Sequence, residues 1–125
     1  MKYMLMMHTG QSQTEGIFSW PEEDVKAHIA FQHDLDQELR DSGELLYSEG
    51  LSFPEQAKVV RYEGIGSPQV TDGPFPESKE FLIGFWIIDC ESPERAVEIA
   101  GKASAAPGAG GVPLGIPIEL RPIMG

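Results

Sequence analysis

Residues 81–88 constrain the fold of this chain more than any other segment. The run reads Phe-Leu-Ile-Gly-Phe-Trp-Ile-Ile, so it is rich in strand-forming residues and has no polar side chain. A strand with one solvated face should alternate apolar and polar residues, because successive side chains point to opposite faces of the sheet. Residues 3–7, Tyr-Met-Leu-Met-Met, break this alternation in the same way. We therefore predict strands over 3–7 and 81–88 that are covered on both faces.

A second copy of the chain is the simplest cover for the outer face of such a sheet. The chain has 125 residues, which predicts a single domain over 1–125 with too little length for a third layer. A hydrophobic content of 41% is enough for a core. We therefore expect a homodimer that packs through its sheet faces.

Two helices are predicted from capping residues. The first extends from Glu22 to Ser42, with Ser19 as its N-cap and Gly43 as its C-terminal stop. The second opens at Ser92, which precedes a proline at the first helical position. The apolar side of the second helix is predicted to hold Ala96, Val97, Ala100 and Ala103.

Four further strands complete the predicted elements, over 45–52, 57–63, 69–71 and 116–124. The last is expected at an edge of the sheet, because its two prolines lack a ladder donor. A polar loop follows the first strand, and residues 105–115 form an irregular connection rich in Gly, Ala and Pro. This order predicts an α+β fold of the ferredoxin-like type, an antiparallel sheet with two helices on one face.

Charge and composition narrow the classes of partner. Nine basic and 20 acidic residues give a net charge of −11, which disfavours nucleic acid and anionic membrane surfaces as partners. A single cysteine cannot build a disulfide framework or a Cys-rich zinc site. The apolar run at the start is too short for a signal peptide, so we expect a cytoplasmic protein. No nucleotide or metal motif occurs, and we expect neither an organic cofactor nor a metal.

His28 is the first candidate for chemistry. At the helical period, His28 shares one stripe with Val25, Phe31 and Leu35, whereas His33 lies outside it. The two histidines are about 140° apart around the axis, so they cannot hold one metal ion from this helix. An imidazole among apolar neighbours can act as a general acid or base near neutral pH. The alternative is a core histidine whose ring nitrogens bond to backbone or water.

Asp72 is the second candidate, because a loop carboxylate can orient an imidazole or take a proton itself. The alternative for Asp72 is a purely structural role, since Asp-Gly-Pro is a strong turn former.

Four further residues are predicted to bind a small-molecule substrate. Arg61 and Arg121, with Lys79 nearby, are expected near one end of the sheet, where they could hold a carboxylate or phenolate. Glu49 ends a predicted strand and is a candidate for the pocket. Phe75 is a candidate aromatic contact. Surface solvation is the alternative for the basic side chains, and a core or interface position is the alternative for Phe75.

Several segments resemble a known family. Thr-Asp-Gly-Pro-Phe at 71–75, followed by Glu-Ser-Lys-Glu at 77–80, is similar to the motif of the DGPF family within the YCII-related proteins. Met-Lys-Tyr-Met-Leu at 1–5, Ala-His-Ile-Ala-Phe at 27–31 and the segment 118–124 match as well. Residues 10–20 and 104–117 depart from the family pattern.

This resemblance implies a dimeric α/β-barrel type of ferredoxin-like fold and a His/Asp pair, which maps onto His28 and Asp72. One relative in the family is a dehydrochlorinase of a chlorinated hydroxyhydroquinone, and DGPF members often accompany extracytoplasmic-function sigma factors. Two hypotheses follow from the resemblance and the residues together. The first is a cofactor-independent acid–base enzyme, lyase- or hydrolase-like, acting on a small aromatic or carboxylic substrate. The second is a non-catalytic ligand-binding or regulatory protein linked to sigma-factor signalling.

Overall fold

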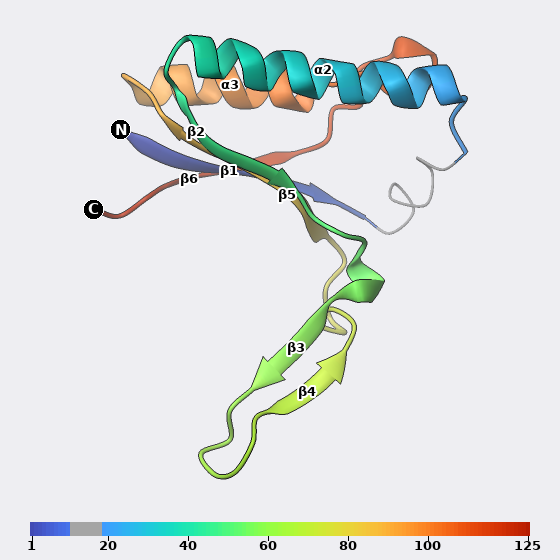
Figure 1. Cartoon of the computed structure of the whole chain (residues 1–125), viewed down its shortest axis with the longest axis vertical. Coiled ribbons are helices and arrows are strands. Elements are labelled where there is room, and N and C mark those ends of the chain that lie inside the picture. Colours follow the sequence, from blue (N-terminus) through green and yellow to red (C-terminus); the bar gives the residue numbers. More distant parts are fainter. Residues whose placement is uncertain (11–18) are drawn as a thin grey trace.

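An antiparallel sheet of four strands carries two helices on one face (Figure 1). The computed structural model describes residues 1–10 and 19–125, and the polar loop predicted after the first strand falls largely outside them. The strand order β2-β5-β1-β6, with every neighbouring pair antiparallel, confirms the predicted α+β ferredoxin-like fold. In chain order the elements are β1 Lys2–Thr9, α2 Glu22–Asp41, β2 Leu45–Gly50, a 3-10 turn Pro54–Gln56, β3 Lys58–Arg61, β4 Gln69–Asp72, β5 Phe81–Asp89, α3 Pro93–Ser104, a 3-10 turn Ala109–Gly111 and β6 Ile118–Pro122.

The core lies between the sheet and the helices. Alternate residues of the two central strands are buried against α2 and α3, among them Leu5 and Ile88, which are both fully buried. Leu39 of α2 and Ile99 of α3 pack onto them from above. The predicted apolar side of α3 is wrong at Val97, which is 62% exposed. Ile99 completes the buried stripe instead, because it follows Ala96 by three positions and precedes Ala103 by four.

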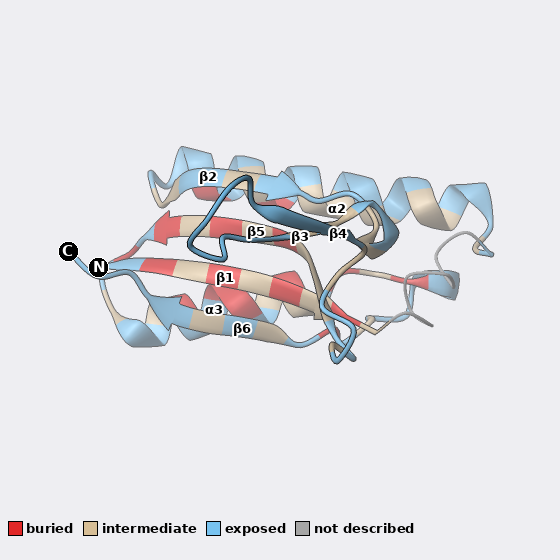
Figure 2. Ribbon diagram, turned by 90° about the horizontal axis from the view of Figure 1, so that it is seen from below, coloured by how far each residue is buried: buried red, intermediate tan, exposed pale blue. Residues whose placement is uncertain are grey.

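The other face of the sheet is apolar and carries no second layer in the described part of the chain. Met4 and Met6 of β1 stand opposite Ile87 and Phe85 of β5 on this face, and all four side chains are half-buried. Tyr47 of β2 packs its ring against Phe85, with ring centroids 5.9 Å apart. Figure 2 views the sheet from this side, with no helix in front of β1 or β5. The missing alternation in 3–7 and 81–88 therefore reflects a core face and an outer face that are both apolar.

Strands β3 and β4 form a two-stranded hairpin that projects from the body, and we call residues 58–72 the arm (Figure 1). Within the described residues, the two strands of the arm pair only with one another: Lys58 opposes Asp72, and Arg61 opposes Gln69. Nearly every side chain of the arm is exposed, including Ile65 at its tip. The strand predicted over 57–63 therefore exists, in a shorter form, but it lies outside the main sheet.

The helix ends follow two of the three predicted capping residues. Ser92 caps α3 by accepting a hydrogen bond from the backbone N–H of Arg95 at 3.1 Å, and Gly43 ends α2 with a φ of 81°. Pro93 follows Ser92 as the first residue of α3, as predicted. The prediction of Ser19 as the N-cap of α2 is wrong, because Pro21 occupies that position and no side chain caps the helix.

A half-buried ion pair joins α3 to the turn after α2. Arg95 of α3 donates two hydrogen bonds, each 2.9 Å long, to the carboxylate of Glu44 in the turn after α2. These hydrogen bonds hold the pKa of Glu44 below its ordinary value, and the same contact raises the pKa of Arg95. No helix in the described residues is both long and apolar enough to cross a membrane.

Candidate functional site

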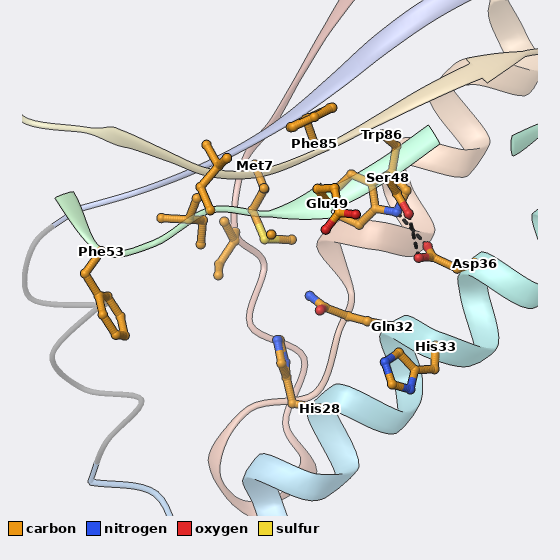
Figure 3. A pocket seen from close by; sticks show the side chains of 15 residues that line it. Met7, His28, Gln32, His33, Asp36, Ser48, Glu49, Phe53, Phe85 and Trp86 are labelled. Carbon is orange, nitrogen blue, oxygen red and sulfur yellow. Dashed lines mark hydrogen bonds between the residues drawn. The ribbon is translucent and has the colours of Figure 1, made fainter. Parts of the chain in front are cut away.

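A cavity of about 380 Å³ lies between α2 and the ends of β2 and β5 (Figure 3). Its walls combine a polar side on the helix with an apolar side on the strands. The polar and charged residues that line it are His28, Gln32, His33, Asp36, Ser48 and Glu49. The apolar and glycine residues are Met7, Gly50, Leu51, Phe53, Ile83, Gly84, Phe85, Trp86 and Ile116.

The polar side is built by one stripe of α2. His28, Gln32 and Asp36 are four residues apart, so they lie one above another along the helix and point toward the strands (Figure 3). This stripe borders the apolar stripe that contains Leu35 and Leu39. The predicted inward position of His28 is therefore confirmed. His33 is exposed, as predicted, but it also lines the cavity at the rim.

The ring of His28 is held in one orientation. Its Nδ1 lies 2.9 Å from the carbonyl oxygen of Pro107, and the ring packs edge-on against Trp20 with centroids 5.7 Å apart. A carbonyl oxygen can only accept a hydrogen bond, so Nδ1 carries the proton. In the neutral ring, Nε2 therefore keeps the free lone pair. No group in residues 1–10 or 19–125 bonds to Nε2, and the ring projects into the cavity.

Two hydrogen bonds anchor the segment that follows Pro107, the residue whose carbonyl contacts His28. The backbone N–H of Gly108 donates to the carbonyl of Val112 at 2.7 Å, and the N–H of Gly110 donates to the Asp24 carboxylate at 3.0 Å. A side chain at Gly108 would meet Leu114 at 2.6 Å, so only glycine fits there without a shift. The connection predicted as irregular over 105–115 thus has a fixed shape, and it orients His28.

Asp36 joins three elements at the inner wall of the cavity. Its carboxylate accepts one hydrogen bond from the indole N–H of Trp86 at 2.9 Å and one from the hydroxyl of Ser48 at 2.7 Å (Figure 3). Trp86 is only 6% exposed, so Asp36 is the partner of a buried donor. Sequence reasoning did not select Asp36. Its position eight residues after His28 was the available signal, because that spacing continues one polar stripe.

Negative charge dominates the cavity lining. Asp36 and Glu49 bring two carboxylates, while no lysine or arginine lines the cavity among the described residues. Glu49 stands opposite Phe85 near the end of β2 and is exposed, and it makes no ion pair within the described part of the chain. Glu49 thus lines the cavity, and its role in binding a substrate stays a prediction. Among residues 1–10 and 19–125, no three His, Cys, Asp or Glu side chains lie close enough together to hold a metal ion.

The structure does not bring Asp72 to His28 within one chain. Asp72 is the last residue of β4, on the arm, and its carboxylate pairs with Lys58 at 2.6 Å. Its side chain is 86% exposed. The orienting partner that the sequence analysis expected from Asp72 is supplied by the Pro107 carbonyl. Asp72 is not at the cavity because the Asp-Gly-Pro turn closes the base of the arm rather than an end of the main sheet.

The remaining predicted residues lie away from this cavity. Arg61 is exposed on the arm, and Arg121 is exposed on β6 opposite Met4, so the two do not share one end of the sheet as predicted. Phe75 is 56% exposed and lines a second cavity of about 400 Å³ at the base of the arm. Phe53 lines both cavities. Cys90 is buried.

The sheet order, the helices on one face and the cavity beside the first helix define a small α+β domain of ferredoxin-like type. The chain belongs to the YCII-related domain family, whose pattern matches residues 1–112. An uncharacterized protein of Rhizobium meliloti (strain 1021) is 42% identical to the chain over 53 residues. That match spans 42% of this chain and 43% of the relative, so the chain covers less than half of the relative's length.

Proposed function

We propose that the chain binds a small organic molecule in the cavity beside α2 and that His28 exchanges a proton with it. One observation carries this proposal: the Pro107 carbonyl holds the proton of His28 on Nδ1, which leaves the Nε2 lone pair available toward a cavity of about 380 Å³. Cavities of this size accommodate small organic ligands. A fixed tautomer is what a general base requires, because the basic nitrogen must meet the substrate proton.

The proton path in this site is short. Nε2 takes a proton from an O–H, N–H or acidic C–H group of the bound molecule, and the resulting imidazolium keeps its Nδ1–H bond to Pro107. A backbone carbonyl stabilises that cation more weakly than a carboxylate, so the site suits a molecule that is itself acidic or activated. Returning the proton to a leaving group completes a lyase- or hydrolase-like reaction, in which His28 acts first as base and then as acid.

We propose that the binding form is a homodimer joined through the outer face of the sheet. Met4, Met6, Phe85, Ile87 and Tyr47 make that face apolar, and the described chain places no layer over it. Burying such a face against a second copy removes apolar surface from water. Light scattering at micromolar concentration should give twice the mass of the chain, and Phe85→Glu should give the monomer mass. A monomeric mass for the unaltered chain would contradict the dimer but leave the cavity proposal standing.

Ligand binding can be tested with variants that separate the two ring nitrogens of His28. In His28→Asn the amide can still donate to Pro107, as Nδ1 does, but the group that represents Nε2 is lost. His8→Asn is the matched control, because His8 lies on the opposite face of the sheet, where its Nε2 contacts Glu119 at 3.0 Å. A library of small aromatic compounds screened by ligand-observed NMR supplies the probes.

The expected result is that hits shift backbone resonances around the cavity and bind His28→Asn at least about tenfold more weakly, while His8→Asn binds them normally. Hits that also decompose should decompose more slowly with His28→Asn. Hits that bind at the cavity but are never converted would favour the non-catalytic ligand-binding alternative, including a role in sigma-factor signalling. Equal affinity of the His28 variant and the unaltered chain would contradict the role of Nε2.

A further inference from the structure

The charge of the cavity lining restricts what can bind there. Asp36 and Glu49 line the cavity, and no lysine or arginine lines it within the described residues. Residues 11–18, Gln-Ser-Gln-Thr-Glu-Gly-Ile-Phe, contain neither lysine nor arginine, so this segment adds no cation to the chain. The whole chain carries a net charge of −11, which adds to the negative potential. An anionic ligand would therefore enter against repulsion without a cation of the cavity to pair with.

Several basic side chains that could serve an anion are engaged elsewhere. Arg95 is bound to Glu44, Lys102 to Glu38 at 2.7 Å, and Lys58 to Asp72. Arg61 and Arg121, the residues predicted to hold a carboxylate, lie on the arm and on the outer face. Neither arginine therefore lines this cavity, where it could pair with a carboxylate.

Hydrogen-bond acceptors predominate among the polar groups of the cavity. Nε2 of His28 accepts in the neutral ring, and the Glu49 carboxylate has no ion-pair partner in residues 1–10 and 19–125. Asp36 already accepts two hydrogen bonds and still contributes its charge. An ammonium group complements this lining, because it has three donors, no acceptor and one positive charge.

The opposite wall selects an apolar body. Met7, Ile83 and Ile116 line this side, together with the aromatic side chains of Phe53 and Trp86. A benzene ring or a short branched chain would bury its surface there, and the apolar contact would contribute about 25 cal/mol for each Å² removed from water.

We propose that the ligand of this cavity is a small amine with an apolar or aromatic body, bound as its ammonium form toward Glu49 and Asp36. This inference rests on the proposed function, because it names the chemical class that the same cavity takes. With such a ligand, the Nε2 lone pair of His28 accepts a hydrogen bond from one ammonium N–H group, and the proton stays on the amine.

Three probes of similar size isolate the charge of the ligand: 2-phenylethylamine, 2-phenylethanol and 3-phenylpropionate. Each is titrated into the full chain at pH 7 and followed by protein NMR and calorimetry. We expect the amine to bind most tightly, the alcohol less tightly, and the carboxylate roughly tenfold or more below the amine. Glu49→Gln should weaken binding of the amine by about threefold to tenfold, so that the amine then binds little more tightly than the alcohol. Glu91→Gln, an exposed acidic position in the connection between β5 and α3, is the control and should change neither the affinity for the amine nor that for the alcohol.

The outcomes separate this inference from the proposed function. Carboxylate binding at the cavity as tight as amine binding would overturn the amine proposal and leave small-molecule binding intact. Amine affinity that is unchanged in Glu49→Gln would overturn the amine proposal as well. If none of the three probes shifts resonances around the cavity at millimolar concentration, the proposed function itself fails.

Discussion

Replacing Asp36 should both destabilise the fold and loosen the wall of the cavity. Its carboxylate accepts hydrogen bonds from Trp86 at 2.9 Å and from Ser48 at 2.7 Å. Hydrogen bonds to a charged group contribute about 1.5–3 kcal/mol each, and a buried donor left without a partner costs about 1–3 kcal/mol. Trp86 is 6% exposed and pays that cost in Asp36→Ala, whereas the hydroxyl of Ser48 is half-buried and can turn toward water. We expect a loss of about 3 kcal/mol for Asp36→Ala.

Asp36→Asn separates charge from shape. The amide oxygen still accepts from Trp86 and the amide N–H₂ can donate to Ser48, so the loss should be about 1 kcal/mol. Urea unfolding at pH 7 measures both losses, and each kcal/mol should lower the melting temperature by roughly 4 °C for a chain of this length. Asp34→Asn, exposed on the same helix, is the control. An Asp36→Ala protein whose free energy of unfolding lies within about 0.5 kcal/mol of the unaltered chain would refute this reasoning.

Further predictions concern the ion pair, the segment beside His28 and the arm. Glu44→Gln should cost about 2 kcal/mol at pH 7 by urea unfolding. The pKa of Glu44 is lowered in the folded chain, so the stability from its bond to Arg95 is present above about pH 4.5 and is lost as the pH falls through the folded pKa. If the free energies of unfolding of Glu44→Gln and the unaltered chain still differ by the same amount at pH 3, this cause is contradicted. Gly108→Ala should cost about 1–3 kcal/mol by overpacking and weaken ligand binding through the neighbouring carbonyl. Gly101→Ala, in open space on α3, should instead be neutral or stabilising, and equal melting temperatures for the two variants would argue against the close contact. Asp72→Asn should leave 2-phenylethylamine affinity within about twofold, whereas a tenfold loss would mean that the arm of a partner copy reaches the cavity.

The main sheet and its helices could be predicted because local patterns specify them. The apolar run 81–88 reports burial on one face and an apolar surface on the other, and Ser92 and Gly43 mark helix ends by their own chemistry. The inward position of His28 follows from the helical period alone. These features depend on spacing along one element, which the sequence contains directly.

The partners of the candidate site could not be predicted in the same way. Asp72 lies on the arm because β3 pairs with β4 and not with the main sheet, and pairing between distant strands is not written in either strand alone. The group that orients His28 is a backbone carbonyl. Every residue has one, so the residue type at position 107 does not predict this contact. The role of Asp36 depends on Trp86 and Ser48, which are 50 and 12 positions away along the chain.

The tautomer of His28 tests the central claim most directly. In a long-range ¹H–¹⁵N NMR correlation spectrum at alkaline pH, the unprotonated ring nitrogen of His28 should couple to both ring C–H protons, which identifies it as Nε2. Addition of 2-phenylethylamine should then move the resonance of that nitrogen. A spectrum in which Nδ1 is the unprotonated nitrogen would mean that the Pro107 carbonyl does not hold the ring, and the proposed proton transfer in this cavity would be wrong.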